Sequence, residues 1–443
     1  MRWILLTGMT AALGAAAFLR GGVDPAQWTW IAAGLLVLGI VSSLHRDPRD
    51  RVLEGALCAM CGYVLLQVVP LPEGLVAWLS PEAAAIWRGA GRTGSMPLSV
   101  APASTVELGI RLAALAAALL TARRLGWLFR DQLWIAAAPV VVVAFLESLI
   151  GLMQFSLTRA QPVAAALSAS GTYVNRNHFA GLLETALPVA LALGITFYAR
   201  GATRHATSGR AAIKASLWFS IALCLLLGVV ASLSRMGFLS TLGGLGIAAL
   251  AAAGARGRGR RARPGGWRAW WPAAAIAAGL AWMFIFLPTD ALIARFASLA
   301  QTEELGEDTR AQIWRDTSRL IEAYPVTGAG LGAYEWALLK YKTAAPDKTV
   351  DFAHNDYLQF AAELGAAGSL LLLGCAAVVL RRLWRAVRGA RGRRNWWLAV
   401  GLLGSLAAMA LHSLADFNLY IPANALAIAW LAGLASSEAM EQR

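Results

Sequence analysis

The sequence predicts an all-α integral membrane protein with about twelve transmembrane helices, and three observations support this prediction. The 443 residues are 58% hydrophobic and only 14% charged. Apolar runs of about 20 residues, the length that crosses a hydrocarbon core, recur along the chain. The basic residues lie mostly in short segments between these runs. Because backbone groups in lipid must be hydrogen-bonded within their own segment, we expect the apolar runs to be helices.

The predicted spans cover most of the chain and leave a few longer connections between them. The first apolar run has no convincing cleavage site, so we interpret it as a span and not as a removed signal peptide. In order, the spans are expected at 3–19, 26–44, 52–70, 105–122, 132–155, 179–199, 215–233, 237–255, 269–288, 358–380, 396–415 and 417–435.

The distribution of Lys and Arg predicts the orientation of these spans. A basic cluster follows each even-numbered span up to the tenth, at 46–51, 123–130, 200–214, 256–268 and 381–394. By the positive-inside rule these segments and both termini are expected in the cytoplasm. The net charge of +14 is then a topology signal. It predicts contact with anionic membrane lipids and no nucleic-acid partner.

The odd-numbered connections should face outward, and two of them are long. The segment 71–104 has amphipathic, Trp-containing pieces and is expected to lie on the membrane surface. The other contains a predicted helix over 308–323, which Pro325 ends. The domain organisation is therefore nine spans with the loop 71–104 in residues 1–288, an outward catalytic loop over 289–357, and three spans in 358–443.

Two arginines in outward-facing segments are candidates for binding an anion. Arg235 stands nearly alone between two apolar runs, where an arginine either extends to the interface or meets a buried partner such as phosphate. Arg310 begins the predicted helix 308–323. It either forms a surface ion pair with Glu307 or Asp308, or strengthens the anion site at the helix N-terminus.

His354 is the strongest candidate for acid–base chemistry. A histidine with an ordinary pKa of about 6.5 accepts a proton near neutral pH. Asp351 or Asp356 would orient its imidazole ring. In the alternative interpretation, His354, Asn355 and Asp356 only cap the helix that follows.

Two further histidines lie beside polar residues at outward span ends. His178 follows Asn177, and His412 precedes Asp416 by one helical turn. No two histidines have the i, i+4 spacing of a helical zinc site, so we predict no metal centre.

Other polar positions leave alternatives open. The glycine string 328–332 either places flexible backbone close to a phosphate or forms a plain turn. The carboxylates Glu147 and Glu184 lie within apolar runs and are expected to pair across helices. Glu107 is expected to pair with Arg111 at i, i+4.

Several motifs occur in a characteristic order: Ser234-Arg235, Arg310-x-x-x-Trp314, Pro325 with the glycine string, His354-Asn355-Asp356-Tyr357-Leu358 and Glu363-x-Gly365. This combination resembles the O-antigen ligase and polymerase superfamily of bacterial envelope glycosyltransferases. The stretches 171–184 and 412–424 also resemble members of that group.

The resemblance implies a GT-C-like fold in the bacterial inner membrane, with a periplasmic active site and a lateral opening to the lipid. It implies a glycan donor carried on undecaprenyl diphosphate, and no metal or other cofactor. Arg235 and Arg310 match the arginines that hold the donor diphosphate, and His354 matches the histidine that activates the acceptor hydroxyl. We assign Arg176 to the donor-binding group, and Asn355, Asp356, Asp351, His178, Asn177, Glu363, His412 and Asp416 to a supporting group.

The predicted activity is a direct, inverting glycan transfer to a hydroxyl of lipid A–core, of another carrier-linked glycan, or of a protein. The short interval between Arg310 and His354 leaves ligase and polymerase both open. The alternatives of another class are a flippase or transporter for lipid-linked oligosaccharide and a scaffold in an envelope assembly complex. Transporters often contain internal repeats, and the sequence shows no convincing one.

Overall fold

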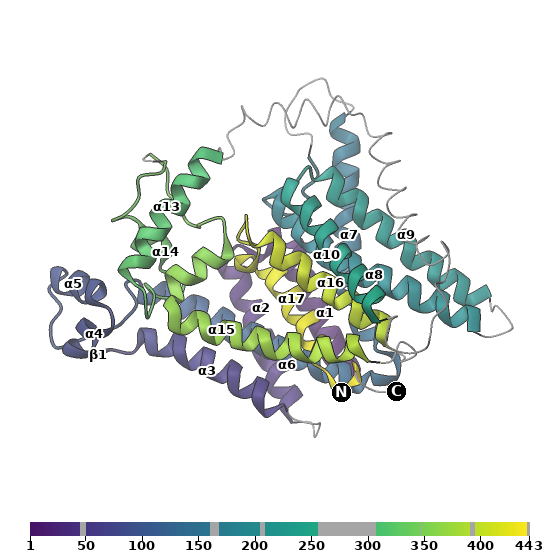
Figure 1. The fold of residues 1–443 in the computed structure, drawn as a ribbon, viewed down its shortest axis with the longest axis horizontal. Coiled ribbons are helices and arrows are strands. Elements are labelled where there is room, and N and C mark those ends of the chain that lie inside the picture. Colours follow the sequence, from purple (N-terminus) through teal and green to yellow (C-terminus); the bar gives the residue numbers. More distant parts are fainter. Residues whose placement is uncertain are drawn as a thin grey trace.

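The computed structural model describes residues 1–44, 50–159, 168–203, 209–255, 307–345, 347–389 and 395–440, which are mostly helical (Figure 1). In this part of the chain, eight helices are long and apolar enough to cross a membrane. They are α2 (Pro25–Ser43), α3 (Arg51–Val68), α6 (Pro102–Leu128), α7 (Trp134–Arg159), α8 (Arg176–Thr203), α9 (Gly209–Ala231), α10 (Arg235–Gly254) and α15 (Asp356–Arg388).

Three other predicted spans form shorter apolar helices: α1 (Arg2–Phe18), α16 (Trp396–His412) and α17 (Pro422–Ala435). The predicted span 269–288 lies outside the described residues. The structure therefore confirms an all-α protein with many membrane-length helices, whereas the number twelve stays a prediction.

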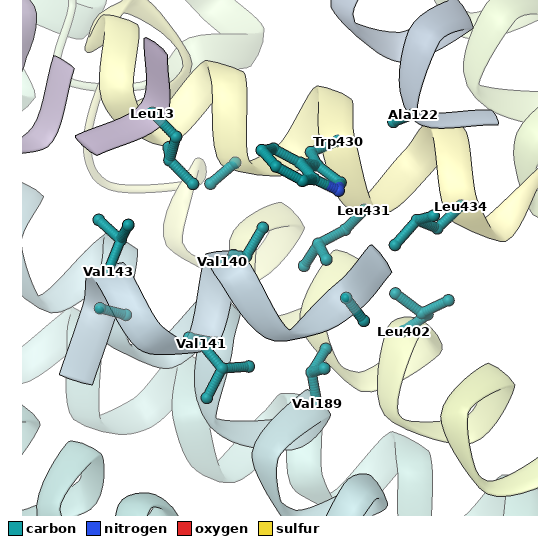
Figure 2. Close-up of a cluster of buried hydrophobic side chains, with 14 of the residues drawn as sticks. Leu13, Ala122, Val140, Val141, Val143, Val189, Leu402, Trp430, Leu431 and Leu434 are labelled. Carbon is teal, nitrogen blue, oxygen red and sulfur yellow. The ribbon is translucent and has the colours of Figure 1, made fainter. Parts of the chain in front are cut away.

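The main core surrounds α17, in which nearly every residue is buried. Trp430 and Leu431 of α17 pack beside Val140 of α7 and Leu402 of α16 (Figure 2). The indole N–H of Trp430 donates to the Ala136 carbonyl at 2.9 Å. The ring is therefore fixed by apolar packing and by one hydrogen bond.

Small residues allow α17 and α6 to lie close together. A Cβ atom at Gly433 would meet the Leu119 carbonyl oxygen at 2.2 Å. The facing side of α6 carries buried Ala114, Ala118 and Ala122. Such contacts favour helix association in lipid, where burial of apolar surface supplies little driving force.

A second hydrophobic core lies at one end of the helix bundle and forms what we call the cap unit, residues 71–101 and 307–350. It contains α4 (Glu73–Leu79), α5 (Pro81–Gly89), α13 (Glu307–Ala323) and α14 (Tyr334–Leu338). The two-residue strands β1 (Leu71–Pro72) and β2 (Ser95–Met96) pair antiparallel. Val76, Ala83, Ile313, Leu320 and Tyr334 share this core, so the two long connections fold against each other.

The helix α15 is interrupted at Gly365, which has φ 60° and ψ −168°. The break frees backbone groups on both sides, and the segment 325–330 pairs with them. The N–H groups of Ala329 and Gly330 donate to the carbonyls of Ala362 and Glu363, and those of Ala366 and Ala367 donate to Pro325 and Val326. Non-helical backbone at this position is stable because these bonds are made inside the protein.

Side chains of α3 complete this junction. The Gln67 amide donates to the carbonyls of Thr327 and Glu363 and accepts from the Leu331 N–H. The Glu363 carboxylate accepts from the Gly332 N–H at 2.8 Å. The N–H groups of the glycine string are thus used within the protein, which favours a structural role over phosphate binding.

The opposite end of the bundle carries basic residues paired with acidic ones. Arg382 of α15 contacts Asp50 at 2.5 Å, and Arg123 of α6 contacts Glu438 at 3.5 Å. The start of α1 and the last described residues, up to Met440, lie at this end, away from α13 and α14 (Figure 1). The cytoplasmic location of this end stays a prediction.

Candidate active site

Three histidines converge on Asp416, which lies between α16 and α17. Nε2 of His178 is 3.5 Å from Oδ1 of Asp416, and Nδ1 of His354 is 3.9 Å from the same oxygen. Nε2 of His412 is 3.9 Å from Oδ2. The histidines belong to the start of α8, the residues before α15 and the end of α16, so the structure joins three separate span ends.

An aromatic wall lines this cluster, which we call the histidine cluster (His178, His354, His412 and Asp416). The ring of Phe417 packs edge-to-face with His178 at 4.7 Å and with His354 at 5.0 Å between centroids. Phe352 stacks on Phe417 at 4.1 Å. This wall excludes water from one side of both imidazoles and restricts how their rings can turn.

Asp416 is held as an anion although it is only 1% exposed. Burial alone would raise the pKa of its carboxyl group. The contact with His178 and the electrostatic effects of His178, His412 and His354 outweigh burial and hold the pKa of Asp416 below its usual range.

His354 is held neutral. Burial lowers the pKa of its imidazole to about 4, against the opposing effects of Asp416 and Asp351 and with a further lowering by Arg310 and His178. Its side chain is 20% exposed, in contrast to the buried carboxylate behind it. A neutral imidazole with one accessible edge can accept a proton from a bound molecule.

The backbone of His354 adopts a left-handed conformation, with φ 50°. Its preceding residue fixes this turn, because the Trp314 indole N–H donates to the Ala353 carbonyl at 2.9 Å and the Ala353 N–H donates to Gln359 at 2.6 Å. A non-glycine residue persists in this conformation only where its surroundings impose it. Trp314 belongs to α13, so the cap unit helps to place His354.

Asn355 and Asp356 serve mainly to hold the start of α15. The Asn355 side chain accepts from the N–H groups of Tyr357 and Leu358 as an N-cap, and its amide donates to the Leu414 carbonyl. Asp356 accepts from the Ser413 hydroxyl at 2.7 Å. The carboxylate beside the His354 ring is therefore Asp416, whereas the sequence suggested Asp356 or the exposed Asp351.

A buried carboxylate that the sequence did not assign to the site extends the cluster. Oε1 of Glu184 on α8 is 3.0 Å from Nδ1 of His412, and the Ser240 hydroxyl of α10 donates to Oε2 at 2.5 Å. Pairing across helices was expected for Glu184, but its partner was not predictable from spacing. Glu147 was also expected to pair across helices, but it binds Thr172 of the non-helical segment before α8, at 2.6 Å.

The three candidate arginines lie at helix starts around the cluster. Arg310 is in the first turn of α13, and its charge acts on His354. Its Nε is buried and has no hydrogen-bond partner among the described residues. Arg176 is half-buried and Arg235 is exposed, and each is the first residue of its helix, α8 and α10 respectively.

The starts of α8 and α10 lie side by side. A Cβ atom at Gly237 would meet the Cβ of Ala180 at 2.6 Å. Arg176 and Arg235 therefore begin adjacent helices next to His178, where the positive ends of two helix dipoles favour a bound anion.

The remaining candidates support the site from a distance. The buried Glu363 accepts from Tyr420 at 2.6 Å and fixes the break in α15. The N–H of Asn177 donates to the Asn175 side chain at the start of α8. Within the described residues, no three His, Cys, Asp or Glu side chains are arranged to hold a metal ion.

Asn424 joins the two stretches that carried part of the resemblance, 171–184 and 412–424. Its amide donates to the His178 carbonyl and to Asn418, each at 2.8 Å, and its oxygen accepts from Tyr173 at 3.1 Å. Sequence alone did not identify Asn424 as a contact of His178, because the two positions are far apart in the chain.

Comparison with known proteins gives a family for the central part of this chain. A family model described as O-antigen ligase matches residues 219–373. This segment contains Arg235, Arg310 and His354 together with α13 and the break in α15. A search of curated proteins gave no significant match. The match over 219–373 supports the resemblance of this chain to the O-antigen ligase superfamily.

Proposed function

We propose that this protein transfers a glycan from undecaprenyl diphosphate to an acceptor hydroxyl at the periplasmic face of the bacterial inner membrane. The transfer is a single, inverting displacement that requires no metal. The observation that carries this proposal is the neutral His354, partly exposed, with Asp416 behind it and Arg310 beside it. The family match supports the general class of reaction.

His354 acts as the general base. Nδ1 is the ring nitrogen that faces Asp416, at 3.9 Å, and we propose that it carries the proton of the neutral ring, which leaves the lone pair on Nε2. As the acceptor oxygen bonds to the anomeric carbon, its proton passes to Nε2 and the bond from that carbon to the diphosphate oxygen breaks. Asp416 stabilises the imidazolium that forms. A positioned base of this kind contributes about 10²–10⁴ in rate.

The arginines stabilise the departing diphosphate, which takes the bonding electrons. Guanidinium groups make bidentate contacts with phosphate oxygens and remain charged. Arg310 lies in the first turn of α13, and Arg176 and Arg235 are the first residues of α8 and α10. We propose that all three supply fixed positive charge where negative charge develops. The bound donor would also raise the pKa of His354, so the base becomes stronger when the substrate is in place.

The same chemistry serves three acceptors: lipid A–core in a ligase, a second carrier-linked glycan in a polymerase, and a protein hydroxyl in an oligosaccharyltransferase. We favour the ligase, because the matching family model is described by that activity. A flippase for lipid-linked oligosaccharide would leave the sugar–diphosphate bond intact, and this difference separates the two classes.

The test uses the purified protein in lipid nanodiscs with a defined undecaprenyl-diphosphate oligosaccharide. Lipid A–core, a second portion of donor and a hydroxyl-containing peptide are offered as acceptors in separate reactions. We expect release of undecaprenyl diphosphate and one glycosylated product, lost in His354→Ala and retained in Arg315→Ala, which changes the exposed face of α13. Normal turnover in His354→Ala would show that His354 is not the general base. A donor that stays intact with every acceptor would show that the protein is not a glycan transferase.

A further inference from the structure

The pair Glu184–His412 is buried beyond the reach of any substrate, and the mechanism above does not use it. Both side chains are 0% exposed. A buried carboxylate–imidazole pair in a membrane protein is costly to maintain and is often functional. Its function is therefore expected to act through the residues that it contacts.

Asp416 lies between the Glu184–His412 pair and the proposed base, His354. Nδ1 of His412 lies 3.0 Å from Glu184, and Nε2 of the same ring lies 3.9 Å from Oδ2 of Asp416. Oδ1 of Asp416 lies 3.9 Å from Nδ1 of His354. Carboxylates and imidazoles thus alternate from Glu184 to His354. Nε2 of His412 and Oδ2 of Asp416 are buried without a hydrogen-bond partner among the described residues.

The pair also connects the helices that begin with the donor-binding arginines. Glu184 lies about two turns beyond Arg176 on α8, and Ser240 lies about one and a half turns beyond Arg235 on α10. Glu184 contacts Ser240 of α10 and His412 of α16 with its two oxygens. The Glu184 carboxylate of α8 therefore connects this helix with α10, through Ser240, and with α16, through His412.

We propose that Glu184 is a positioning residue, which keeps His412 as an imidazolium between two carboxylates and so fixes the Asp416 anion against His354. This inference rests on the proposed glycan transfer. The charged groups that face His412 are Glu184 from α8, Asp416 from the turn after α16 and Asp356 from α15. Without the Glu184 charge, His412 has one carboxylate fewer that favours its positive charge. Asp416 then acts more strongly on His354, because less positive charge on His412 offsets it.

Glu184→Gln is the direct test, since it preserves the shape of the side chain and removes its charge. We expect kcat to fall by up to about 10²-fold, the loss that a small misplacement of a catalytic group can cause. The KM for the donor should change little. The acid limb of the kcat–pH profile should move to higher pH, because His354 becomes easier to protonate.

Glu147→Gln is the matched control. Glu147 is also 0% exposed, but the partner of its carboxylate is Thr172 and not a histidine. We expect the acid limb of this variant to stay at the wild-type pH. An equal shift in both variants, or a wild-type kcat and limb in Glu184→Gln, would overturn the proposal.

Two further variants cover the case in which Glu184→Gln does not fold. His412→Asn removes the imidazolium directly, and Ser240→Ala removes one contact of Glu184. Both should shift the acid limb upward, with the larger effect in His412→Asn, and unchanged limbs in both would refute the inference. Absence of transfer in the wild-type protein would instead refute the proposed function, so the two failures are distinct.

Discussion

The imidazole of His354 and the carboxylate of Asp416 lie 3.9 Å apart, although α15 and α16 separate them in the sequence. Asp416→Asn keeps the size of the side chain and removes the charge that stabilises the imidazolium. We expect kcat to decrease by about 10²-fold or more, at the scale of general-base catalysis. The measurement is steady-state transfer with saturating donor and acceptor.

Asp351→Asn is the control for this substitution, because Asp351 is exposed and lies before the same histidine. Its kcat should remain close to that of the wild type. A wild-type kcat in Asp416→Asn would show that the carboxylate is not needed behind His354.

The pH dependence of transfer should report the ionisation of His354. Because its pKa is lowered to about 4, the imidazole is neutral above that pH and becomes protonated below it. The profile of kcat/KM, which reflects the free enzyme, should lose activity as pH falls through about 4. The acid limb of the kcat profile should lie at higher pH than that of the kcat/KM profile, because bound diphosphate raises the pKa of His354. The opposite order of the two limbs would contradict a donor bound next to this base.

Arg310→Gln should move the limb of kcat/KM to higher pH. The positive charge of Arg310 lowers the pKa of His354, so its removal raises that pKa. The same variant should raise the KM for the donor if the guanidinium binds diphosphate. Arg315→Gln, on the exposed side of α13, should leave both the acid limb and the KM for the donor unchanged.

Gly365→Ala should prevent correct folding of the break in α15. Gly365 has a positive φ, and a Cβ atom there would meet the Gly328 nitrogen at 2.4 Å. We expect a large decrease in the unfolding temperature of the detergent-purified protein, or no folded protein at all. Gly374→Ala on the same helix should be neutral, because a Cβ atom there meets nothing within 4 Å. Equal effects of the two substitutions would argue against a break of α15 at Gly365 that requires glycine.

Asp316→Asn should loosen the cap unit. Asp316 accepts from the N–H groups of Thr343 and Ala344, from the Thr343 hydroxyl and from Gln312. Hydrogen bonds to a charged group contribute about 1.5–3 kcal/mol each, and we expect a loss of at least this order in the free energy of unfolding.

The effect of Asp316 should also depend on pH. Burial opposes ionisation, but the donors from Thr343 and Ala344 outweigh it and lower the pKa of Asp316. The stabilisation is therefore present above the ordinary pKa of about 3.9 and is lost as pH falls through the lowered value. Asp316→Asn should lack this acid-dependent part, as measured by unfolding at a series of pH values.

Much of the helical architecture was predictable because it depends on local pattern. Apolar runs and basic exits predicted the membrane helices, and the helix expected at 308–323 is observed at Glu307–Ala323. The sequence also singled out His178, His354 and His412 as separate candidates.

The convergence of these histidines was not predictable, because contacts between distant span ends determine it. Spacing favoured Asp351 or Asp356 as the partner of His354, whereas folding places Asp416 there. The break at Gly365 was also hidden, because the apolar run of α15 continues through it and its stabilising partner is the segment 325–330.

The central location of α17 has a consequence for biosynthesis. This helix is among the most enclosed in the described bundle, yet it follows the other described spans along the chain. The earlier helices must therefore leave room for it until translation reaches the residues after 420. Asp416 and His412 arrive at nearly the same time, so a nascent chain that lacks them holds His354 without its carboxylate. Under the proposed function, such a chain lacks the complete histidine cluster until α17 is in place.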